Sequence, residues 1–217
     1  MNRCLLVCVS LVSLALGTAC AQKPEPVRVA CIGDSITYGA GVQNREMNCY
    51  PAVLQAMLGD GYIVKNFGVN GATLLNAGDN PYTKQKAYKD ALAFKPNIVV
   101  IKLGTNDTKP QNWKHADKFD ADYAAIIKSF QDLSSKPKVI LCTTVPAYPS
   151  NFGITDTIIK GEVKPKVEAL ANAQKLSMVD LYTALSDKAK LFPDKIHPNA
   201  EGAKLIAEAV KSAIPPK

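Results

Sequence analysis

The chain reads VRVACIGDSIT from Val27 to Thr37, an apolar run that ends in Gly-Asp-Ser. A short run of β-branched and small apolar side chains is typical of a strand that is buried on both faces. The glycine and the polar residues after it mark the end of that strand. The stretch therefore predicts a strand over 27–32, with Ser35 just beyond its carboxyl end.

Similar apolar runs recur along the chain and alternate with segments of helical periodicity. They predict strands over 62–67, 98–103, 139–143 and 176–179 and helices that include 51–58, 123–133 and 205–213. This alternation indicates a parallel sheet with right-handed crossovers, because parallel neighbours need a helix to return the chain. We expect an α/β fold, a three-layer α/β/α sandwich with a five-stranded parallel sheet. Its ligand site should lie at the carboxyl ends of the strands.

The first 21 residues have the pattern of a secretory signal peptide. Arg3 precedes an apolar run from Cys4 to Leu16, and Ala19-Cys20-Ala21 fits a cleavage site that leaves Gln22 as the first residue. A lipoprotein signal, in which Cys20 carries the lipid, is the alternative. The segment predicts export to the periplasm or beyond the cell.

Residues 22–217 are expected to form one domain, and their composition excludes several classes of function. No stretch in them reaches the roughly 20 consecutive apolar residues of a membrane-spanning helix, so no stable membrane insertion of the mature chain is expected. The formal net charge of the chain is +7. Its lysines are dispersed rather than interleaved with aromatic residues, which argues against nucleic acid as a partner.

The cysteines and histidines argue against a disulfide framework and a metal site. Cys31, Cys49 and Cys142 are the three cysteines that remain after the signal, and none of them forms a C-x-x-C pair. We therefore expect each to be a small buried apolar residue. His115 and His197 are the only two histidines, too few for a histidine-based metal site. No metal or other cofactor is expected.

A serine, a histidine and a carboxylate are spaced as nucleophilic catalysis requires. Ser35 follows the first strand, at the sheet edge where α/β folds expose functional groups. Asp194 precedes His197 by three residues, so one turn can bring its carboxylate to Nδ1 and leave Nε2 to accept the serine proton. Pro198 disfavours a helical conformation at His197 and predicts a loop there. Asp180 is a rival orienting carboxylate, but it is much further away in the sequence.

Two further loops at the same edge offer hydrogen-bond donors. The sequence Gly104-Thr-Asn-Asp ends the third strand and presents the side-chain amide of Asn106. The sequence Asn70-Gly-Ala-Thr follows the second strand, where Gly71 allows a backbone N–H to approach an oxyanion closely. Each loop alone could be an ordinary turn. Together with Ser35 they form the constellation that acyl transfer needs.

At this point the sequence resembles the SGNH or GDSL-type esterases. The resemblance covers nearly all of residues 22–217 and rests on four blocks in order: Gly33-Asp34-Ser35, Gly71, Gly104-x-Asn106-Asp107 and Asp194-x-x-His197. It implies a flavodoxin-like sheet and a serine mechanism that needs no cofactor. It also implies Ser35, Asp194 and His197 as catalytic residues and an oxyanion hole formed by Ser35, Gly71 and Asn106.

Within this family, the segments 104–113 and 153–156 are similar to secreted bacterial carbohydrate O-acetylesterases, the sialate O-acetylesterase-like group in particular. We therefore expect a serine esterase that hydrolyses acetyl esters on a glycan or small molecule through an acyl-enzyme on Ser35. Asp34 and Trp113 are expected to contact the substrate. The alternative for Trp113 is a packing role.

The loops expected around the site favour a sugar over a long acyl chain. Segments 76–84, 108–118 and 147–156 are mostly polar, with isolated aromatic rings at Tyr82, Trp113, Tyr148 and Phe152. The main alternative is a lysophospholipase or thioesterase of the same fold. A non-catalytic carbohydrate-binding protein on this scaffold is a further alternative. A nucleotide-binding protein is disfavoured because neither G-x-G-x-x-G nor a Walker loop follows the first strand.

Overall fold

Five parallel strands form one sheet at the centre of the molecule, in the order β2-β1-β3-β4-β5. The computed structural model describes residues 25–149 and 152–216. The strands are β1 (Val27–Gly33), β2 (Tyr62–Gly68), β3 (Ile98–Lys102), β4 (Lys138–Cys142) and β5 (Ser177–Val179). The predicted three-layer sandwich is confirmed, and each strand begins and ends within one residue of its expected position.

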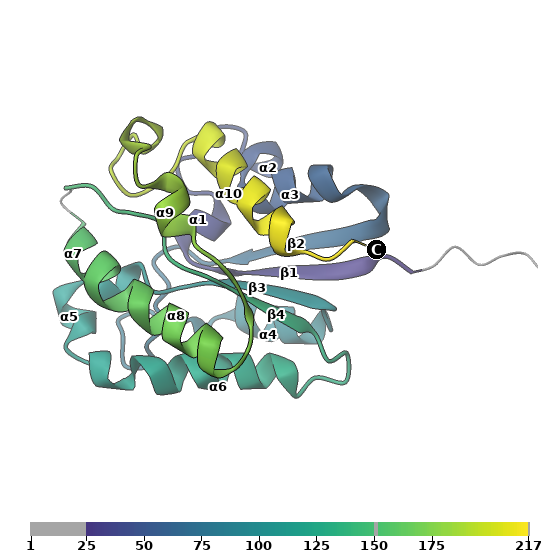
Figure 1. Ribbon diagram of the computed structural model, residues 1–217, viewed down its shortest axis with the longest axis horizontal. Helices are drawn as coiled ribbons and strands as arrows, with labels where there is room; N and C mark the ends of the chain where they lie inside the picture. Colours follow the sequence, from purple (N-terminus) through teal and green to yellow (C-terminus); the bar gives the residue numbers. More distant parts are fainter. Residues whose placement is uncertain (1–24, 150–151, 217) are drawn as a thin grey trace, which may run out of the picture.

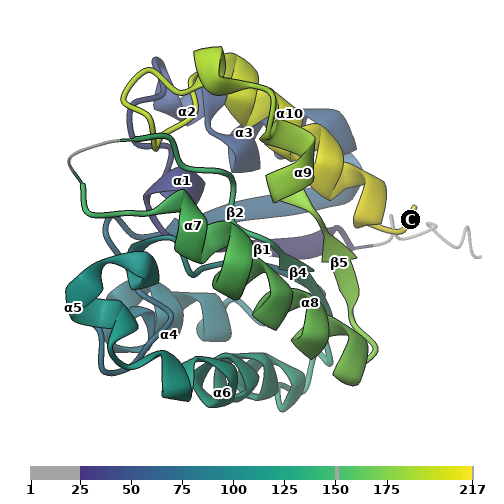
Figure 2. The ribbon, with the colours of Figure 1, turned by 60° about the vertical axis from the view of Figure 1, so that its left-hand side comes forward.

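Helices cover both faces of the sheet (Figures 1 and 2). On one face lie α1 (Ser35–Tyr38), α2 (Arg45–Asn48), α3 (Tyr50–Leu58), α9 (Leu181–Leu185) and α10 (Ala200–Ala213). On the other lie α4 (Lys86–Ala93), α5 (Pro110–Trp113), α6 (Phe119–Gln131), α7 (Asp156–Ile158) and α8 (Lys164–Ala173). Short helical turns complete the connections: η1 (Gly59–Gly61), η2 (Tyr82–Lys84), η3 (Asn106–Thr108), η4 (Ala116–Lys118), η5 (Ile159–Val163) and η6 (Ala189–Leu191).

Most of the core lies in two apolar layers, one on each face of the sheet. Successive side chains of a strand point to opposite faces, so Val29 and Cys31 of β1 join the layer that contains α3, α9 and α10. Ala30 and Ile32 join the layer that contains α4, α6 and α8. Both faces of the sheet are therefore buried, as a parallel sheet requires.

The cysteines are part of this packing. Cys31, Cys49 and Cys142 are free and buried. Burial raises the pKa of the Cys142 thiol to about 12, although the charge of Lys102 works against the shift. Their expected role as small apolar residues is confirmed.

The predicted signal peptide, with its cleavage site and Cys20, lies outside the described residues. Across 25–149 and 152–216, no helix combines the length and the apolar character needed to cross a membrane.

The pairing of β1 sets three loops at the same height along one edge of the sheet. Gly33 lies opposite Gly68 of β2 and opposite Lys102 of β3. A Cβ atom at Gly33 would lie 2.0 Å from Thr37 Oγ1, and one at Gly68 would lie 2.1 Å from Tyr38 N. A larger residue at either glycine position would clash with α1. The helix α1 thus rests directly on the sheet edge.

A buried ion pair lies beneath this edge. Lys102 Nζ is 2.9 Å from Asp34 Oδ2 and 3.0 Å from Asp34 Oδ1, and both side chains have no exposed surface. Lys102 Nζ also donates to Thr105 Oγ1 at 3.1 Å, while Asp34 Oδ1 accepts the Ile36 N–H at 2.9 Å. The pair therefore connects the end of β3 to the first turn of α1.

Replacing Lys102 by Met should lower the free energy of unfolding by about 3–5 kcal/mol, because the Asp34 carboxylate would remain buried without a countercharge. Urea titration of the purified variant measures this loss. The double variant with Asp34→Asn should regain part of it, since an amide carries no charge and can still accept the Ile36 N–H.

The matched control is Lys128→Met, which breaks the exposed ion pair between Lys128 and Asp132. It should cost less than about 1 kcal/mol. Equal losses for the two lysine variants would contradict a structural role for the buried pair.

Candidate active site

Ser35 is the first residue of α1, immediately after the Asp34 cap. The helix has a single turn and ends at Gly39, whose φ of 94° lies in the left-handed region. A residue at a helix N-terminus has no intrahelical partner for its N–H, so the Ser35 N–H can donate to a ligand. Ser35 is only 8% exposed, and it lines a pocket at the carboxyl edge of the sheet.

The imidazole of His197 reaches Ser35 from the loop that precedes α10. His197 Nε2 lies 2.8 Å from Ser35 Oγ, across 162 positions of sequence. On the other side of the ring, His197 Nδ1 lies 2.6 Å from Asp194 Oδ2. With Nδ1 protonated and donating to the carboxylate, Nε2 is free to accept the serine proton.

Asp194 is held by more than the imidazole. Its Oδ1 accepts the backbone N–H groups of Ile196 at 3.0 Å and of His197 at 2.7 Å. Partial burial of Asp194 opposes ionisation, but the hydrogen bonds from His197 and Ile196 outweigh it and hold the pKa of this carboxyl below its usual range. The carboxylate is thus ionised and fixed where it can orient the imidazole.

The rival carboxylate, Asp180, has a different set of partners. It caps α9 through the Thr183 N–H and hydroxyl, and it lies 3.0 Å from Lys164 Nζ. These contacts give Asp180 a structural role, and Asp194 alone of the two carboxylates bonds the imidazole.

Two further groups converge on the same pocket. Gly71 follows β2 with a φ of 73°, in the left-handed region that favours glycine. Asn106, 4% exposed, follows β3 and donates one of its two amide hydrogens to the Ala72 carbonyl at 3.1 Å. The second amide hydrogen has no partner among the described residues. Both groups line the pocket with Ser35, at the edge where Gly33, Gly68 and Lys102 are in register.

The pocket has a volume of about 320 Å³. Its lining comes from five separate segments, one after each strand of the sheet, and consists of Ser35, Ala40, Asn70, Gly71, Asn106, Lys109, Phe152, Ile154 and His197. The pocket therefore holds a hydroxyl, an oriented imidazole and several hydrogen-bond donors within one small space, the arrangement that acyl transfer uses.

Comparison with known proteins agrees with this geometry. Residues 31–205 match the GDSL-like Lipase/Acylhydrolase family. This chain belongs to that family. An acetylxylan esterase of Xylanibacter ruminicola is 45% identical over 212 residues, which cover 89% of this chain and 44% of the relative. The chain thus spans less than half the length of that protein.

Solved structures show the same fold at low sequence identity. The carbohydrate acetylesterase Est24 from Sinorhizobium meliloti is 22% identical with a TM-score of 0.68, over 86% of this chain and 97% of that chain. A catalytic mutant of Axe2, an acetylxylan esterase from Geobacillus stearothermophilus, is 21% identical with the same TM-score of 0.68, over 87% and 94%. The finer resemblance to sialate O-acetylesterases stays a prediction.

Two residues expected to contact substrate in this GDSL-like site do not line it. Asp34 has no exposed surface and is bonded to Lys102 and to the Ile36 N–H, so its expected substrate contact is wrong. Trp113 packs edge-on against Phe119, and its indole N–H donates to Glu162 at 3.0 Å. Trp113 therefore has the packing position that was its alternative.

Of the other aromatic rings expected at the rim, one lines the pocket. Phe152 is 52% exposed and lies edge-on to the His197 ring, with 6.2 Å between ring centroids. Tyr82 is buried and donates to the Phe67 carbonyl at 2.7 Å. Tyr148 packs on Phe192 and donates to backbone carbonyls of the α9 end. Sequence alone did not separate these rings, because all four lie in loops of similar composition.

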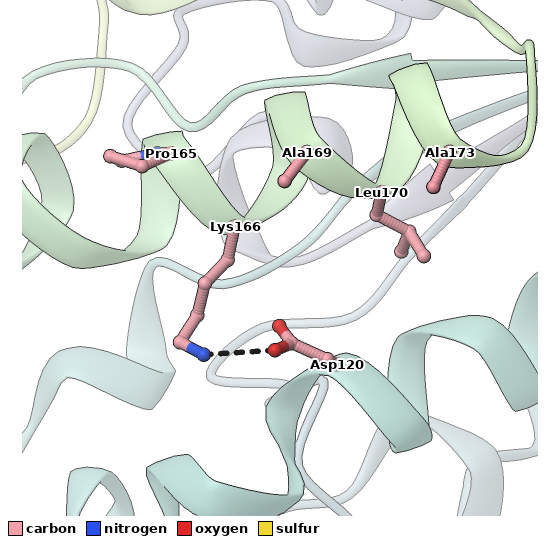
Figure 3. Close-up of a pocket in the computed structure, with 6 residues that line it drawn as sticks. All are labelled: Asp120, Pro165, Lys166, Ala169, Leu170 and Ala173. Atoms are coloured by element: carbon pink, nitrogen blue, oxygen red, sulfur yellow. Dashed lines mark hydrogen bonds and ion pairs between the residues drawn. The ribbon is translucent and has the colours of Figure 1, made fainter.

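A second cavity, of about 400 Å³, lies between α6 and α8 (Figure 3). It is lined by Asp120, Pro165, Lys166, Ala169, Leu170 and Ala173, and Lys166 is paired with Asp120 at 3.0 Å. This lining contains no nucleophile paired with a base, so the pocket at Ser35 is the candidate active site.

Asp107 has no role that its sequence pattern predicts, and it lies directly behind the donors in the structure. Its two carboxylate oxygens accept the N–H groups of Leu74 at 3.0 Å and Leu75 at 2.8 Å. The turn that carries Asn106 is thereby tied to the loop that carries Gly71. Complete burial raises the pKa of Asp107 to about 7, although the two N–H groups work against the shift.

This shift predicts a pH dependence of stability. Because the pKa of Asp107 is higher folded than unfolded, the folded state retains a proton between about pH 4 and pH 7 that the unfolded state releases. The contribution of Asp107 to stability therefore falls as pH rises through this range. Relative to Asp107→Asn, which cannot titrate, the wild type should lose about 2–3 kcal/mol of unfolding free energy between pH 5 and pH 8.

Urea titrations of both proteins at several pH values measure that difference in unfolding free energy. The other titratable groups are the same in both proteins, so their contributions cancel. Asp117→Asn, at an exposed position in η4, is the control and should follow the wild-type curve. A constant difference between wild type and Asp107→Asn from pH 5 to pH 8 would show that Asp107 does not titrate in this range.

Proposed function

We propose that this chain is a carboxylic-ester hydrolase that removes acetyl groups from carbohydrate through an acyl-enzyme on Ser35. The observation that carries the proposal is the continuous chain of short contacts from Ser35 Oγ through both nitrogens of His197 to Asp194. It opens into a pocket lined by Gly71 and Asn106. Membership of the GDSL-like family and 45% identity to an acetylxylan esterase support the same reaction.

In the first step, Ser35 Oγ attacks the ester carbonyl carbon while His197 Nε2 takes the hydroxyl proton. The carbonyl π electrons move to oxygen and form a tetrahedral oxyanion. The imidazolium then gives its proton to the sugar oxygen as the C–O bond breaks, which leaves an acetyl group on Ser35. Asp194 stabilises the transient positive charge on the imidazole.

The oxyanion would be bound by the Ser35 N–H, the Gly71 N–H and the Asn106 amide. These donors are fixed before the reaction starts, since Asn106 is already bonded to the Ala72 carbonyl and Asp107 fixes the neighbouring loop. Donors of this kind stabilise the transition state without further reorganisation. In the second step, a water deprotonated by His197 attacks the acyl carbon, and acetate leaves as Ser35 regains its proton.

Ser35→Ala and His197→Ala should each lower kcat by roughly 10⁴-fold or more, because nucleophile and base act as one unit. For the same reason, the double variant should be little slower than either single one. The measurement is acetate release from acetylated xylo-oligosaccharides and from p-nitrophenyl acetate.

Two variants provide matched controls. Ser212→Ala changes an exposed serine of α10, and His115→Ala removes the other histidine, which lies outside the pocket. Both should retain the wild-type rate and show that the losses are specific. Near-normal turnover in Ser35→Ala would end the serine-esterase proposal.

The enzyme should prefer short acyl chains. Phe152 and Ile154 form an apolar wall of the small pocket, next to His197. A lipase with a long groove gains roughly 0.8 kcal/mol for each methylene that it buries, so its kcat/KM rises from acetate to octanoate. Here kcat/KM on p-nitrophenyl esters should be highest for acetate and fall steeply by hexanoate.

Phe152→Ala should shift this preference toward butyrate by opening the wall, whereas Met47→Ala, at a 74% exposed side chain of α2, should not. A kcat/KM that increases toward octanoate would favour the lysophospholipase or thioesterase alternative.

We also propose that the chain is exported, on the basis of Arg3, the apolar run to Leu16 and the Ala19-Cys20-Ala21 site. Intact-mass analysis of the protein from its native host should find Gln22 as the first residue. A lipid on Cys20 would indicate membrane anchoring instead, and a soluble product that retains Met1 would refute export.

A further inference from the structure

Lys109 is the one residue with an ammonium group among those that line the pocket. The other lining groups are neutral when the His197 imidazole is unprotonated, as the base of the proposed reaction must be. The proposed chemistry uses the hydroxyl, the imidazole and N–H donors, and assigns nothing to this ammonium group. Its presence beside Asn106 therefore needs a separate explanation.

The backbone of Lys109 is held firmly at the start of α5. Its N–H donates to the Asn106 carbonyl at 3.3 Å, and its own carbonyl accepts the N–H groups of Asn112 and Trp113 at 2.9 Å each. The stem of the side chain lies beside Gly153, since a Cβ atom at Gly153 would be 3.9 Å from Lys109 Cγ. Lys109 is half-buried in this position. The backbone of Lys109 is thus held by the same turn that carries Asn106, and its side chain starts beside Gly153.

No hydrogen bond or ion pair engages Lys109 Nζ within residues 25–149 and 152–216. Other partly or fully buried lysines differ, because Lys102 is paired with Asp34 and Lys164 with Glu168 and Asp180. Asp79 is the nearby carboxylate. Burial raises its pKa, but hydrogen bonds from Gln111 and Asn112 and the charge of Lys109 outweigh this and lower it. Gln111 and Asn112 donate hydrogen bonds to the Asp79 carboxylate. Asp79 and Lys109 attract each other, but no hydrogen bond or ion pair joins them within the described residues.

A substrate seated in the pocket would displace water from this ammonium group. Removing water from a cation is costly unless an anion replaces it. A carboxylate on the substrate would supply that anion, and the positive formal charge of the whole chain would assist its approach.

We propose that Lys109 makes this pocket selective for acetylated saccharides that carry a carboxylate, such as acetylated uronic acid units, over neutral acetylated sugars. This inference rests on the proposed esterase function and names the substrate class of the same site. Lys109 would bind the substrate carboxylate while Ser35 attacks the neighbouring acetyl ester.

The test uses matched pairs of substrates that differ in one group. Mono-acetylated methyl glycosides of glucuronic and galacturonic acid are compared with those of glucose and galactose, which replace the carboxylate by a hydroxymethyl group. The readout is the ratio of kcat/KM for the acidic member to that for the neutral member. In the wild type at low salt, this ratio should be about 5- to 30-fold for at least one pair.

Lys109→Gln keeps most of the stem that lies beside Gly153 and should bring the ratio close to one. Lys109→Glu should invert it, and 0.5 M NaCl should reduce it in the wild type because salt screens the interaction. Lys114→Ala, at an exposed position on the same segment, is the matched control and should keep the wild-type ratio.

A wild-type ratio near one for every pair would overturn the proposal. An unchanged ratio in both Lys109 variants would also overturn it. That outcome includes variants in which kcat/KM falls equally on the acidic and the neutral substrates. The salt dependence of the wild type gives an answer even if a variant fails to fold. If the wild type cleaves neither these sugars nor p-nitrophenyl acetate, the esterase proposal itself fails, which is a distinguishable result.

Discussion

The position of β1 between β2 and β3 is the constraint on which the site depends. In a parallel sheet the carboxyl ends of neighbouring strands lie at one edge, and here Gly33 is level with Gly68 and Lys102. Three chain segments that are far apart in sequence therefore leave the sheet together, each with one group for the pocket. The glycines matter because they leave room for α1, and with it Ser35, to sit against the edge.

Hydrogen bonds to buried carboxylates turn this coarse alignment into a fixed geometry. Asp34 connects α1 to Lys102 at the end of β3, and Asp107 connects the Asn106 turn to the loop after Gly71. On the far side of the pocket, the Tyr148 N–H donates to the Lys195 carbonyl at 2.9 Å, beside His197. The reacting groups thus lie on loops that are fixed to one another, which is how a loop-built site acquires the rigidity that oxyanion binding needs.

Much of this could be predicted from the sequence because the signals are local. Apolar runs identify strands that need burial on both faces, and a polar group directly after such a strand must lie at the sheet edge. The Asp194 to His197 contact is also local, since it closes over three residues. The partners of Asp34 and Trp113 were not predictable in this way, because Lys102 and Glu162 lie 68 and 49 positions away. A lysine at the end of an otherwise apolar strand was the available signal for the buried pair.

The charges around Ser35 differ in what they require of a substrate. Asp34 and Lys102 neutralise each other below the pocket floor, and Asp194 is matched by the imidazole and two N–H groups. These charges are balanced before any ligand arrives, so they shape the site without selecting what enters it. Lys109 lines the pocket, and within the described residues no ion pair or hydrogen bond holds its charge, which acts on Asp79 only at longer range. Specificity in this fold would therefore come from the loops, while the sheet edge supplies chemistry that is indifferent to the sugar.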